Sequence, residues 1–323
     1  MAVGYGRDSW ASVLSEATYG TTPAGTESYF RIIEATDGMD RAVKISPSLQ
    51  GATPKNTFLG NKNVKKQIKA EMLYQGLNQF LRHALGTYTY SVDTPVASAN
   101  THGFLTADSL LTGLSVEVCE ANIPSGKVFM YTGCKVAAFE MAFETDEPVI
   151  LTVDLIAQNE TPNTTASGTP SYPAYHPVLW SHAGTLTLAG TASLEFTKGH
   201  IRVDNMLKER HLMHDSTREP MRDGMRKISG EFTIEFEDLT LYTKFITPTT
   251  GALALTYTST EMVTGSTPYT MGIAMAKVQL EKPKIDITST GIVEVTYPFI
   301  SLYNASAADQ LTLTIVNGET TLA

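Results

Sequence analysis

Three things are scarce in this chain of 323 residues: cysteine, charge and long apolar runs. Only two cysteines, Cys119 and Cys134, are present, which excludes a disulfide-rich framework. A turn-like segment at 123–126 should place Cys119 nearer Met130 than Cys134, so we expect no disulfide. No run of residues approaches the ~20 apolar positions that a membrane span needs.

Charged residues make up only 18% of the chain, while hydrophobic residues make up 42%. This balance excludes a disordered polyelectrolyte and favours folded units with substantial cores. Acidic residues outnumber basic ones by 33 to 24, for a net charge of −9. A mildly acidic body does not favour wrapping nucleic acid, which needs cations against phosphates, but it permits nucleic acid to pass by.

Recognisable catalytic and metal-binding motifs are also scarce. There is no nucleophile elbow, no phosphate-binding glycine loop and no Cys-x-x-Cys pair. His211, His214 and Asp215 lie close in sequence, but a metal site needs three or four ligands at fixed distances. We interpret this arginine-rich stretch as a solvated or interface loop.

A Ser–His–Asp trio could be written from Asp8, Ser9 and either His83 or His102. Any chain of this length offers such a trio, so it carries no catalytic prediction. We therefore expect no enzyme activity, no catalytic residue, no metal site and no cofactor.

The chain contains the same pattern twice, an alternating strand-like run followed by a helical run. An alternating apolar–polar run at 64–73 is followed by a helical pattern at 76–86, and a run at 226–236 is followed by a helical pattern at 238–246. Further strand-like runs follow in both halves, but at a smaller offset than the helices. We infer an internal duplication, with an insertion in the first unit at 87–112.

The predicted fold class is mainly β: two tandem β-sandwich units, each with one short flanking α-helix. The first unit spans 1–160 and the second spans 184–323. A Pro-, Thr- and Gly-rich linker at 161–183 separates them. Two stretches with little periodicity, 47–63 and 208–223, are predicted to be long loops.

Both predicted loops and the strands after them are rich in basic residues, including the run Lys62, Lys65, Lys66 and Lys69. Such residues could simply protect sheet edges from aggregation, or they could dock on the acidic face of a neighbour. The sequence leaves both interpretations open. Under the second, the candidate contact residues are Lys55, Lys62, Arg210, Arg218 and Arg222.

The strand pattern at 226–236 separates two faces. Ile228, Phe232, Ile234 and Phe236 are expected to face the sandwich core. Glu231 and Glu235 then point to the opposite side, toward solvent.

Several segments together resemble a known family. They are Gly4-Tyr5-Gly6, Ser15-Glu16-Ala17-Thr18-Tyr19-Gly20-Thr21, Tyr29-Phe30-Arg31-Ile32, Asn205-Met206-Leu207, and the strand from Gly224 to Thr233. The chain resembles the major tail tube proteins of long-tailed (siphovirus-like) bacteriophages. The resemblance implies a β-sandwich with a flanking helix, whose inner sheets join between subunits into a continuous barrel around a lumen. It also implies rings that stack through a long loop and terminal arms.

Because single-unit members form hexameric rings, two units per chain would imply a trimer with pseudo-sixfold symmetry. The implied partners are other copies of this chain, and tail proteins such as the tape measure and terminator. DNA would pass transiently without specific binding. The basic candidates would contact the next ring, and Glu231 and Glu235 would face the channel. The protein would be made and assembled in the host cytoplasm and would reside in the virion tail.

Alternatives remain open at this point. Another tail component of the same fold, such as a distal tail or terminator ring, would form one ring without polymerising. An inner tube of a contractile injection system would share the same features. A secreted adhesin built of β-sandwiches is disfavoured because the N-terminus has no signal-peptide pattern.

Overall fold

The computed structural model describes residues 9–23, 28–45, 57–93, 98–121, 127–163, 166–211, 213, 218–286, 292–306, 309–320 and 322. The chain is mainly β with two short helices, as the sequence predicts. The strands of the first half are β1 (Trp10–Ser15), β2 (Ser28–Arg31), β3 (Glu34–Thr36), β4 (Met39–Ile45), β5 (Thr57–Glu71), β6 (Gly86–Val92), β7 (Asn100–Thr106), β8 (Leu114–Ala121), β9 (Lys127–Glu144), β10 (Ile150–Ala157) and β11 (Asn159–Asn163).

The second half begins after a short 3-10 turn, η2 (Trp180–His182). Its strands are β12 (Leu186–Leu188), β13 (Thr191–Leu194), β14 (Phe196–Asp204), β15 (Leu207–Arg210), β16 (Arg218–Arg222), β17 (Lys227–Glu235), β18 (Gly251–Thr264), β19 (Thr267–Leu280), β20 (Lys284–Asp286), β21 (Glu294–Ser301) and β22 (Thr312–Asn317). The helices are α1 (Asn78–Leu85) and α2 (Thr240–Ile246).

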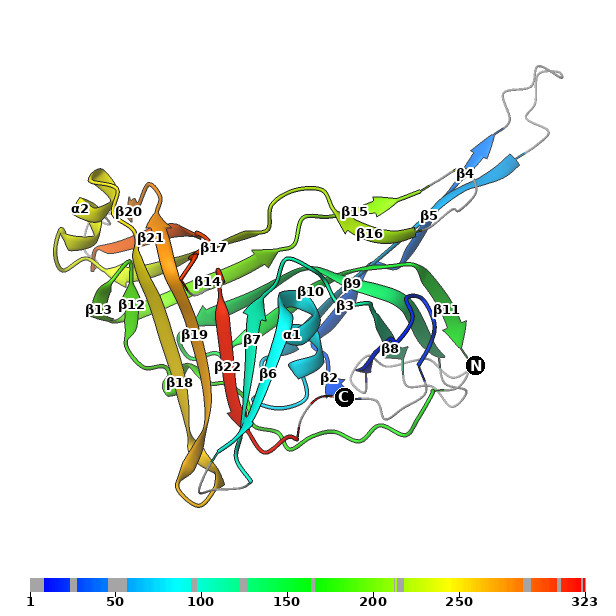
Figure 1. The fold of residues 1–323 in the computed structure, drawn as a ribbon, viewed down its shortest axis with the longest axis horizontal. Coiled ribbons are helices and arrows are strands. Elements are labelled where there is room, and N and C mark those ends of the chain that lie inside the picture. Colours follow the sequence, from blue (N-terminus) through cyan, green and yellow to red (C-terminus); the bar gives the residue numbers. More distant parts are fainter. Residues whose placement is uncertain are drawn as a thin grey trace.

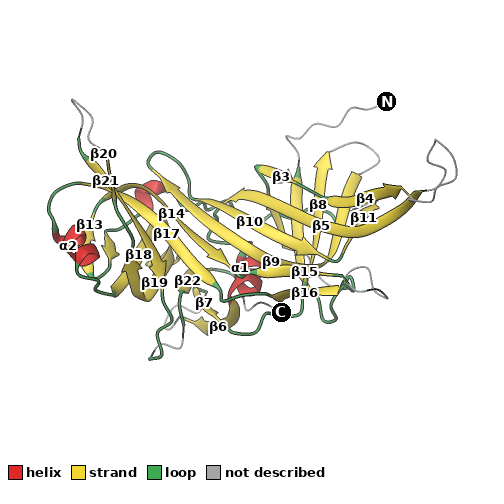
Figure 2. Ribbon diagram, turned by 90° about the horizontal axis from the view of Figure 1, so that it is seen from above, coloured by secondary structure: helices red, strands yellow, loops and turns green. Residues whose placement is uncertain are grey.

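One long antiparallel sheet runs through both halves. Its strand order is β3 or β4, β5, β10, β9, β14, β17, β21 and β20, so that eight positions are filled side by side. Figure 2 shows β5, β10, β9, β14 and β17 side by side across the middle of the molecule. The pairing of β9 with β14 joins the two halves through backbone hydrogen bonds.

A second layer covers the apolar side of this long sheet. In the first half it is built from β2, β1, β8, the first part of β9, and β11. In the second half the order is β13, β12, β18, β19 and β22. The strands alternate in burial, as in β21 and β22, because one face packs in the core and the other faces solvent.

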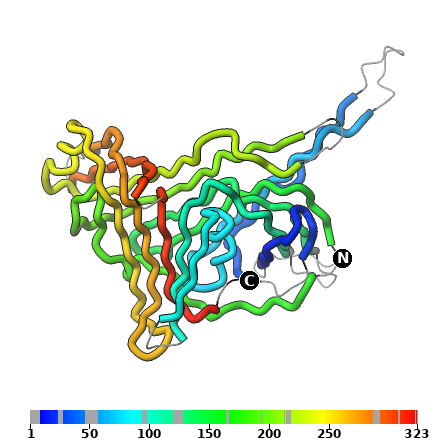
Figure 3. Tube along the Cα trace, viewed as in Figure 1, coloured from blue at the N-terminus to red at the C-terminus, as the bar shows by residue number. Residues whose placement is uncertain are grey.

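The predicted insertion has a clear place in the fold. Residues 86–106 form the hairpin β6–β7, and β7 pairs with β22 at the other end of the chain. The trace in Figure 3 shows the red C-terminal strand beside this cyan hairpin. A hairpin from the first half therefore extends the second layer of the second half.

Helix α1 occupies the predicted position and is almost wholly buried, with Phe80, Leu81, Ala84 and Leu85 in the main core. It ends at Gly86, whose φ of 102° suits a residue without a side chain. Helix α2 also forms where predicted, but Leu241 is its only buried residue. The two helices thus have the same place after a long-sheet strand and very different surroundings.

The described parts of the two predicted loops are mostly strands. Residues 57–63 belong to β5, which pairs with β4, and 207–210 pairs with 218–222 as the hairpin β15–β16. Figure 1 shows both hairpins extending toward the same end of the molecule, opposite α2. Strands with little core contact lack the alternating apolar pattern on which strand prediction rests, so the sequence pattern predicted loops here.

Candidate assembly surfaces

The described residues offer no group of three or more His, Cys, Asp or Glu side chains that could hold a metal ion. His211 instead lies 2.9 Å from the Asn63 side-chain amide, and its sequence neighbours His214 and Asp215 lie outside the described residues. Among the helices that the structure describes, none is long and apolar enough to cross a membrane. Cys119 and Cys134 are both buried and form no disulfide; Cys119 pairs with Val128 and Cys134 with Leu114.

The histidines considered for a catalytic trio have packing roles. His83 is a buried residue of α1, and its Nε2 lies 2.9 Å from the Ser15 hydroxyl. Burial, with Arg82 and Lys135 nearby, lowers the pKa of His83 to about 3. His102 lies 2.9 Å from the Tyr88 hydroxyl through its Nδ1. Asp8 lies outside the described residues.

The largest candidate surface is the polar face of the long sheet, which is the side turned away from the core. It carries eight carboxylates on six adjacent strands, namely Glu71, Glu140, Glu144, Asp154, Asp204, Glu231, Glu235 and Glu294. On the same six strands this face carries five Lys or Arg residues, namely Lys65, Lys69, Lys198, Arg202 and Lys227. A shallow hollow of about 680 Å³ lies over its centre, lined mostly by residues of β9, β10, β14 and β17, with Lys69, Lys284 and Thr296 from neighbouring strands.

Arg202 on β14 forms ion pairs with carboxylates of two other strands in the middle of this face. Its guanidinium lies 3.4 Å from Glu140 and 2.8 Å from Asp154, and these hydrogen bonds and charges raise the pKa of Arg202 against the opposing effect of burial. The Asp154 carboxylate also accepts a 2.7 Å bond from Gln67. One cation is thus shared by two carboxylates, so positive charge here is already neutralised.

The structure places Glu231 and Glu235 on this polar face. Glu231 pairs with His200 on one side and Pro298 on the other, and its carboxylate lies 3.9 Å from the His200 ring. Ile228, Phe232 and Ile234 are buried on the opposite side. Phe236 differs from the expectation: β17 ends at Glu235, and the Phe236 side chain is 38% exposed.

The second surface is the pair of hairpin arms. The first arm is β4 with 57–63 of β5, and it exposes Val43, Ile45, Phe58 and Leu59 by more than half. Lys62 on this arm donates a 3.1 Å hydrogen bond to Asn159, and Lys55 lies outside the described residues. Exposed apolar side chains on a projecting hairpin indicate a contact surface for another protein.

The second arm is β15–β16 with its flanking residues. It exposes four methionines, Met206, Met213, Met221 and Met225, and methionine side chains adapt readily to irregular partners. Arg210 and Arg218 pair across this hairpin.

Arg222 differs from the other basic candidates because its guanidinium is used within the chain. It donates to the backbone carbonyl oxygens of Asn205 at 3.3 Å and Asp108 at 2.9 Å. Its role is therefore at least partly to attach the second arm to the first half. Lys65–Glu209 and Lys135–Glu219 ion pairs, at 3.3 and 2.7 Å, attach the same arm to β5 and β9.

Sequence reasoning missed the polar contacts at the base of this arm. Asn205 is fully buried and its side-chain nitrogen donates to the carbonyl oxygens of Ala84 and Val136, at 2.9 and 3.0 Å. Arg226, in the basic run for which edge protection and docking were both open, donates to the Ala107 carbonyl at 2.6 Å. Burial and the nearby Arg222 lower the pKa of Arg226 to about 10. An Asn directly after a strand signals only a turn, and its distant partners are invisible in sequence.

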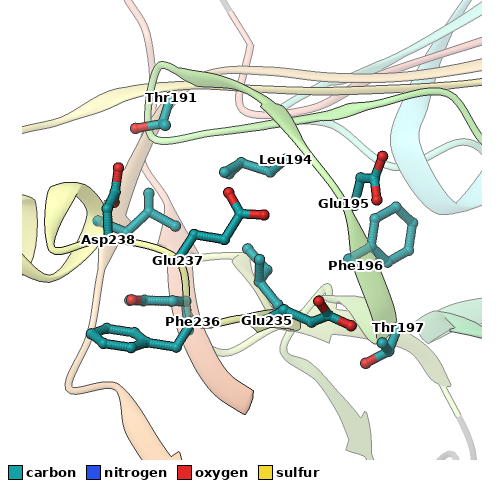
Figure 4. A pocket seen from close by; sticks show the side chains of 12 residues that line it. Thr191, Leu194, Glu195, Phe196, Thr197, Glu235, Phe236, Glu237 and Asp238 are labelled. Carbon is teal, nitrogen blue, oxygen red and sulfur yellow. The ribbon is translucent and has the colours of Figure 1, made fainter. Parts of the chain in front are cut away.

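The third surface lies at the α2 end. A hollow of about 330 Å³ is lined by Glu195, Glu235, Glu237 and Asp238 together with apolar side chains (Figure 4). The Asp238 carboxylate accepts hydrogen bonds from the Thr240 backbone and hydroxyl, which lowers the pKa of Asp238. Four carboxylates therefore gather around this hollow.

Among curated proteins, none matches the chain in sequence. The sequence profile of the family described as "Phage tail tube protein" matches residues 6–301, which is most of the chain. The mainly β fold is consistent with that match, and the chain belongs to the phage tail tube protein family.

Proposed function

We propose that this protein forms the tube of a bacteriophage tail from stacked rings of three chains, and that the polar face of the long sheet lines the channel for DNA. Membership of the family supports a structural, non-enzymatic role in the virion. The finer points, which are ring stoichiometry, channel lining, DNA passage and assembly in the host cytoplasm, are our inference.

The observation that carries the proposal is the order of strands in the long sheet. The first half contributes β3/β4, β5, β10 and β9, and the second contributes β14, β17, β21 and β20. In each half, the second strand leads into a helix and the third is the later strand that pairs back onto it. This agreement supports two equivalent units, at about 1–160 and 184–323, joined by the segment 161–183. Three chains then present six equivalent units.

Simple geometry supports the size of such a ring. Three chains with eight positions each would close a barrel of twenty-four strands. With strands ~4.8 Å apart and tilted by ~40°, the backbone diameter is ~48 Å. Side chains occupy about half of the ~10 Å spacing between packed sheets, which leaves a bore of roughly 35 Å. A single DNA duplex fits such a bore.

The charge of the polar face suits a conduit. Carboxylates exceed cations on it, and the central Arg202 is shared by two carboxylates. Phosphates would therefore meet a face with more carboxylates than cations, and the genome could slide without being held. The arms would contact the next ring through Arg210, Arg218 and their exposed apolar side chains. Other tail proteins, such as the tape measure and terminator, would meet the tube at its lumen and ends.

Negative-stain microscopy of the purified protein tests the proposal. We expect hollow tubes whose cross-sections average to threefold symmetry with six similar lobes. Single rings that never stack would favour a distal tail or terminator role. The inner tube of a contractile system would give the same tubes, and co-purification of a sheath from infected cells would identify it.

A further inference from the structure

The two halves meet through a strand pairing and a corner packed on a helix, and we call this contact the internal junction. Here β9 pairs with β14, from Ala138 opposite Asp204 to Glu144 opposite Lys198. The corner that follows β14 packs on the C-terminal end of α1, where Asn205 binds the Ala84 carbonyl.

An apolar residue on each side of the internal junction is buried. Ile201 on β14 is 0% exposed, and so is Leu85, the last residue of α1. One residue belongs to the strand and corner that dock, and the other belongs to the helix that receives them.

The first half has its own copy of the strand and corner. β3 pairs with β5 as β14 pairs with β17, and each is followed by a corner that leads into an arm. Each corner contains a non-glycine residue with positive φ, Asp37 at 65° and Met206 at 52°, which is uncommon. Ile33 stands three residues before the last paired residue of β3, as Ile201 does in β14. Ile33 is 53% exposed.

The second half has its own copy of the receiving helix. Ile246 ends α2 as Leu85 ends α1, and it is 61% exposed. The sheet edges agree: among the described residues, β3 pairs only with β5, and β20 pairs only with β21. Within the described residues, the chain therefore has one filled junction and, at the two edges of the long sheet, a corner and a helix that are not joined to each other.

We propose that a second copy of this chain fills each end, with its β3–β4 corner seated on α2 and its β3 edge beside the β19–β20 edge, repeating the internal junction. Charge can contribute to this contact: Glu34 is exposed on β3, while Lys284 on β20 and Lys282 just before it are exposed at the other edge, next to Glu281. Joining two different faces head to tail generates a ring when the rotation closes. The proposal rests on the proposed ring and assigns its chain-to-chain contact to specific residues.

A mixing experiment tests this assignment. Ile33→Asp damages only the corner face, and Ile246→Asp damages only the helix face. Each variant alone should remain a 35.0 kDa monomer in analytical ultracentrifugation. An equal mixture still contains one intact pair of faces, so it should give a complex of two chains and no larger ring. Leu239→Asp, at the other end of α2, and Met262→Asp, at the β18–β19 turn, are matched controls, because both residues are more than half exposed and lie away from the junction end of α2.

Each result has a defined meaning. Circular dichroism and thermal melting establish that the variants are folded, which substitution of exposed residues should preserve. Tubes formed by either single variant at the wild-type concentration, or a mixture that stays monomeric, would overturn the assignment of faces. A wild-type protein that forms neither rings nor tubes would overturn the proposed function instead.

Discussion

At the residue scale, buried polar groups hold the fold together at positions that lie far apart in sequence. The Glu16 carboxylate, for example, is only 4% exposed and accepts hydrogen bonds from Gly20, Ser115 and Gly133, at 2.7 to 2.8 Å. Glu319 similarly accepts from Gly76, just before α1, and from Asn78, the first residue of α1. Such groups cost stability when a partner is removed, because the remaining group is left buried and unsatisfied.

Asn205 gives the clearest stability prediction of this kind. Asn205→Ala removes two hydrogen bonds to buried carbonyl oxygens and the acceptor for Arg226 Nε at 2.9 Å. We expect the free energy of unfolding to fall by about 2–4 kcal/mol, measured by chemical denaturation. Asn159→Ala, which removes a more exposed partner of Lys62, should cost less than about 1 kcal/mol. Equal effects of the two substitutions would contradict the importance of the buried site.

His83 predicts how stability depends on pH. Its pKa is lowered from 6.5 to about 3 in the folded chain, chiefly by burial. As pH falls below 6.5 the unfolded chain binds this proton first, so stability is fully present above pH 6.5 and is lost as pH falls toward about 3. The slope attributable to one such group is up to about 1.4 kcal/mol per pH unit.

His83→Gln should flatten this part of the pH dependence. A glutamine can still bond the Ser15 hydroxyl, and it takes up no proton in this range. Chemical denaturation at pH 8 and at pH 5 would measure the effect. The difference in stability between the two pH values should be smaller in the variant by about 2 kcal/mol. An unchanged difference would assign the acid sensitivity to other groups.

At the element scale, local patterns predict some features and long-range pairing determines the rest. The runs at 64–73 and 226–236 alternate in hydrophobicity, and both are strands that lead to the predicted helices. The pairing of β9 with β14, and of β7 with β22, joins residues that no local pattern connects. The outer part of β5, at 57–63, was missed as a strand because none of its residues is buried, so it has no core face to mark it.

The second arm supports a prediction about stacking. Arg210→Glu with Arg218→Glu reverses charge on the outer part of β15–β16, while Arg222 and Arg226 keep the base of the arm attached. We expect the double variant to fold and form rings but to give few or short tubes in negative-stain images. The reason is that four units of charge change on a surface proposed to meet the next ring.

Lys208 and Asp223 provide a matched control for that variant. They form an exposed ion pair at 2.9 Å on the same arm. Lys208→Asp with Asp223→Lys exchanges the two charges and leaves the net charge of the arm unchanged. Tubes of this variant should have wild-type length. Full-length tubes from the double-arginine variant would remove the arm from the stacking contact.

At the scale of the whole molecule, the arrangement of surfaces follows from one long sheet with two unequal faces. The core face is apolar and closed by the second layer, and the polar face carries charges that are partly neutralised by each other. The arms and α2 lie at opposite ends of this sheet (Figures 1 and 2). A molecule with distinct ends and one polar face is suited to head-to-tail assembly around a lumen, and the alternation at 226–236 already indicated which side of β17 is polar.

If the polar face lines the DNA channel, cations added to it should slow genome release. Glu231→Lys with Glu235→Lys changes the charge of the polar face by four units per chain without altering the buried Ile228, Phe232 and Ile234. Each ring of three chains would then present six added cations to a duplex that carries one charge per ~1.7 Å. Each phosphate contact must break before the DNA can advance, so tubes should form normally but genome release should slow. Release can be timed by dye fluorescence from phage that carry the variant. Wild-type release from tubes of normal shape would place this face outside the channel.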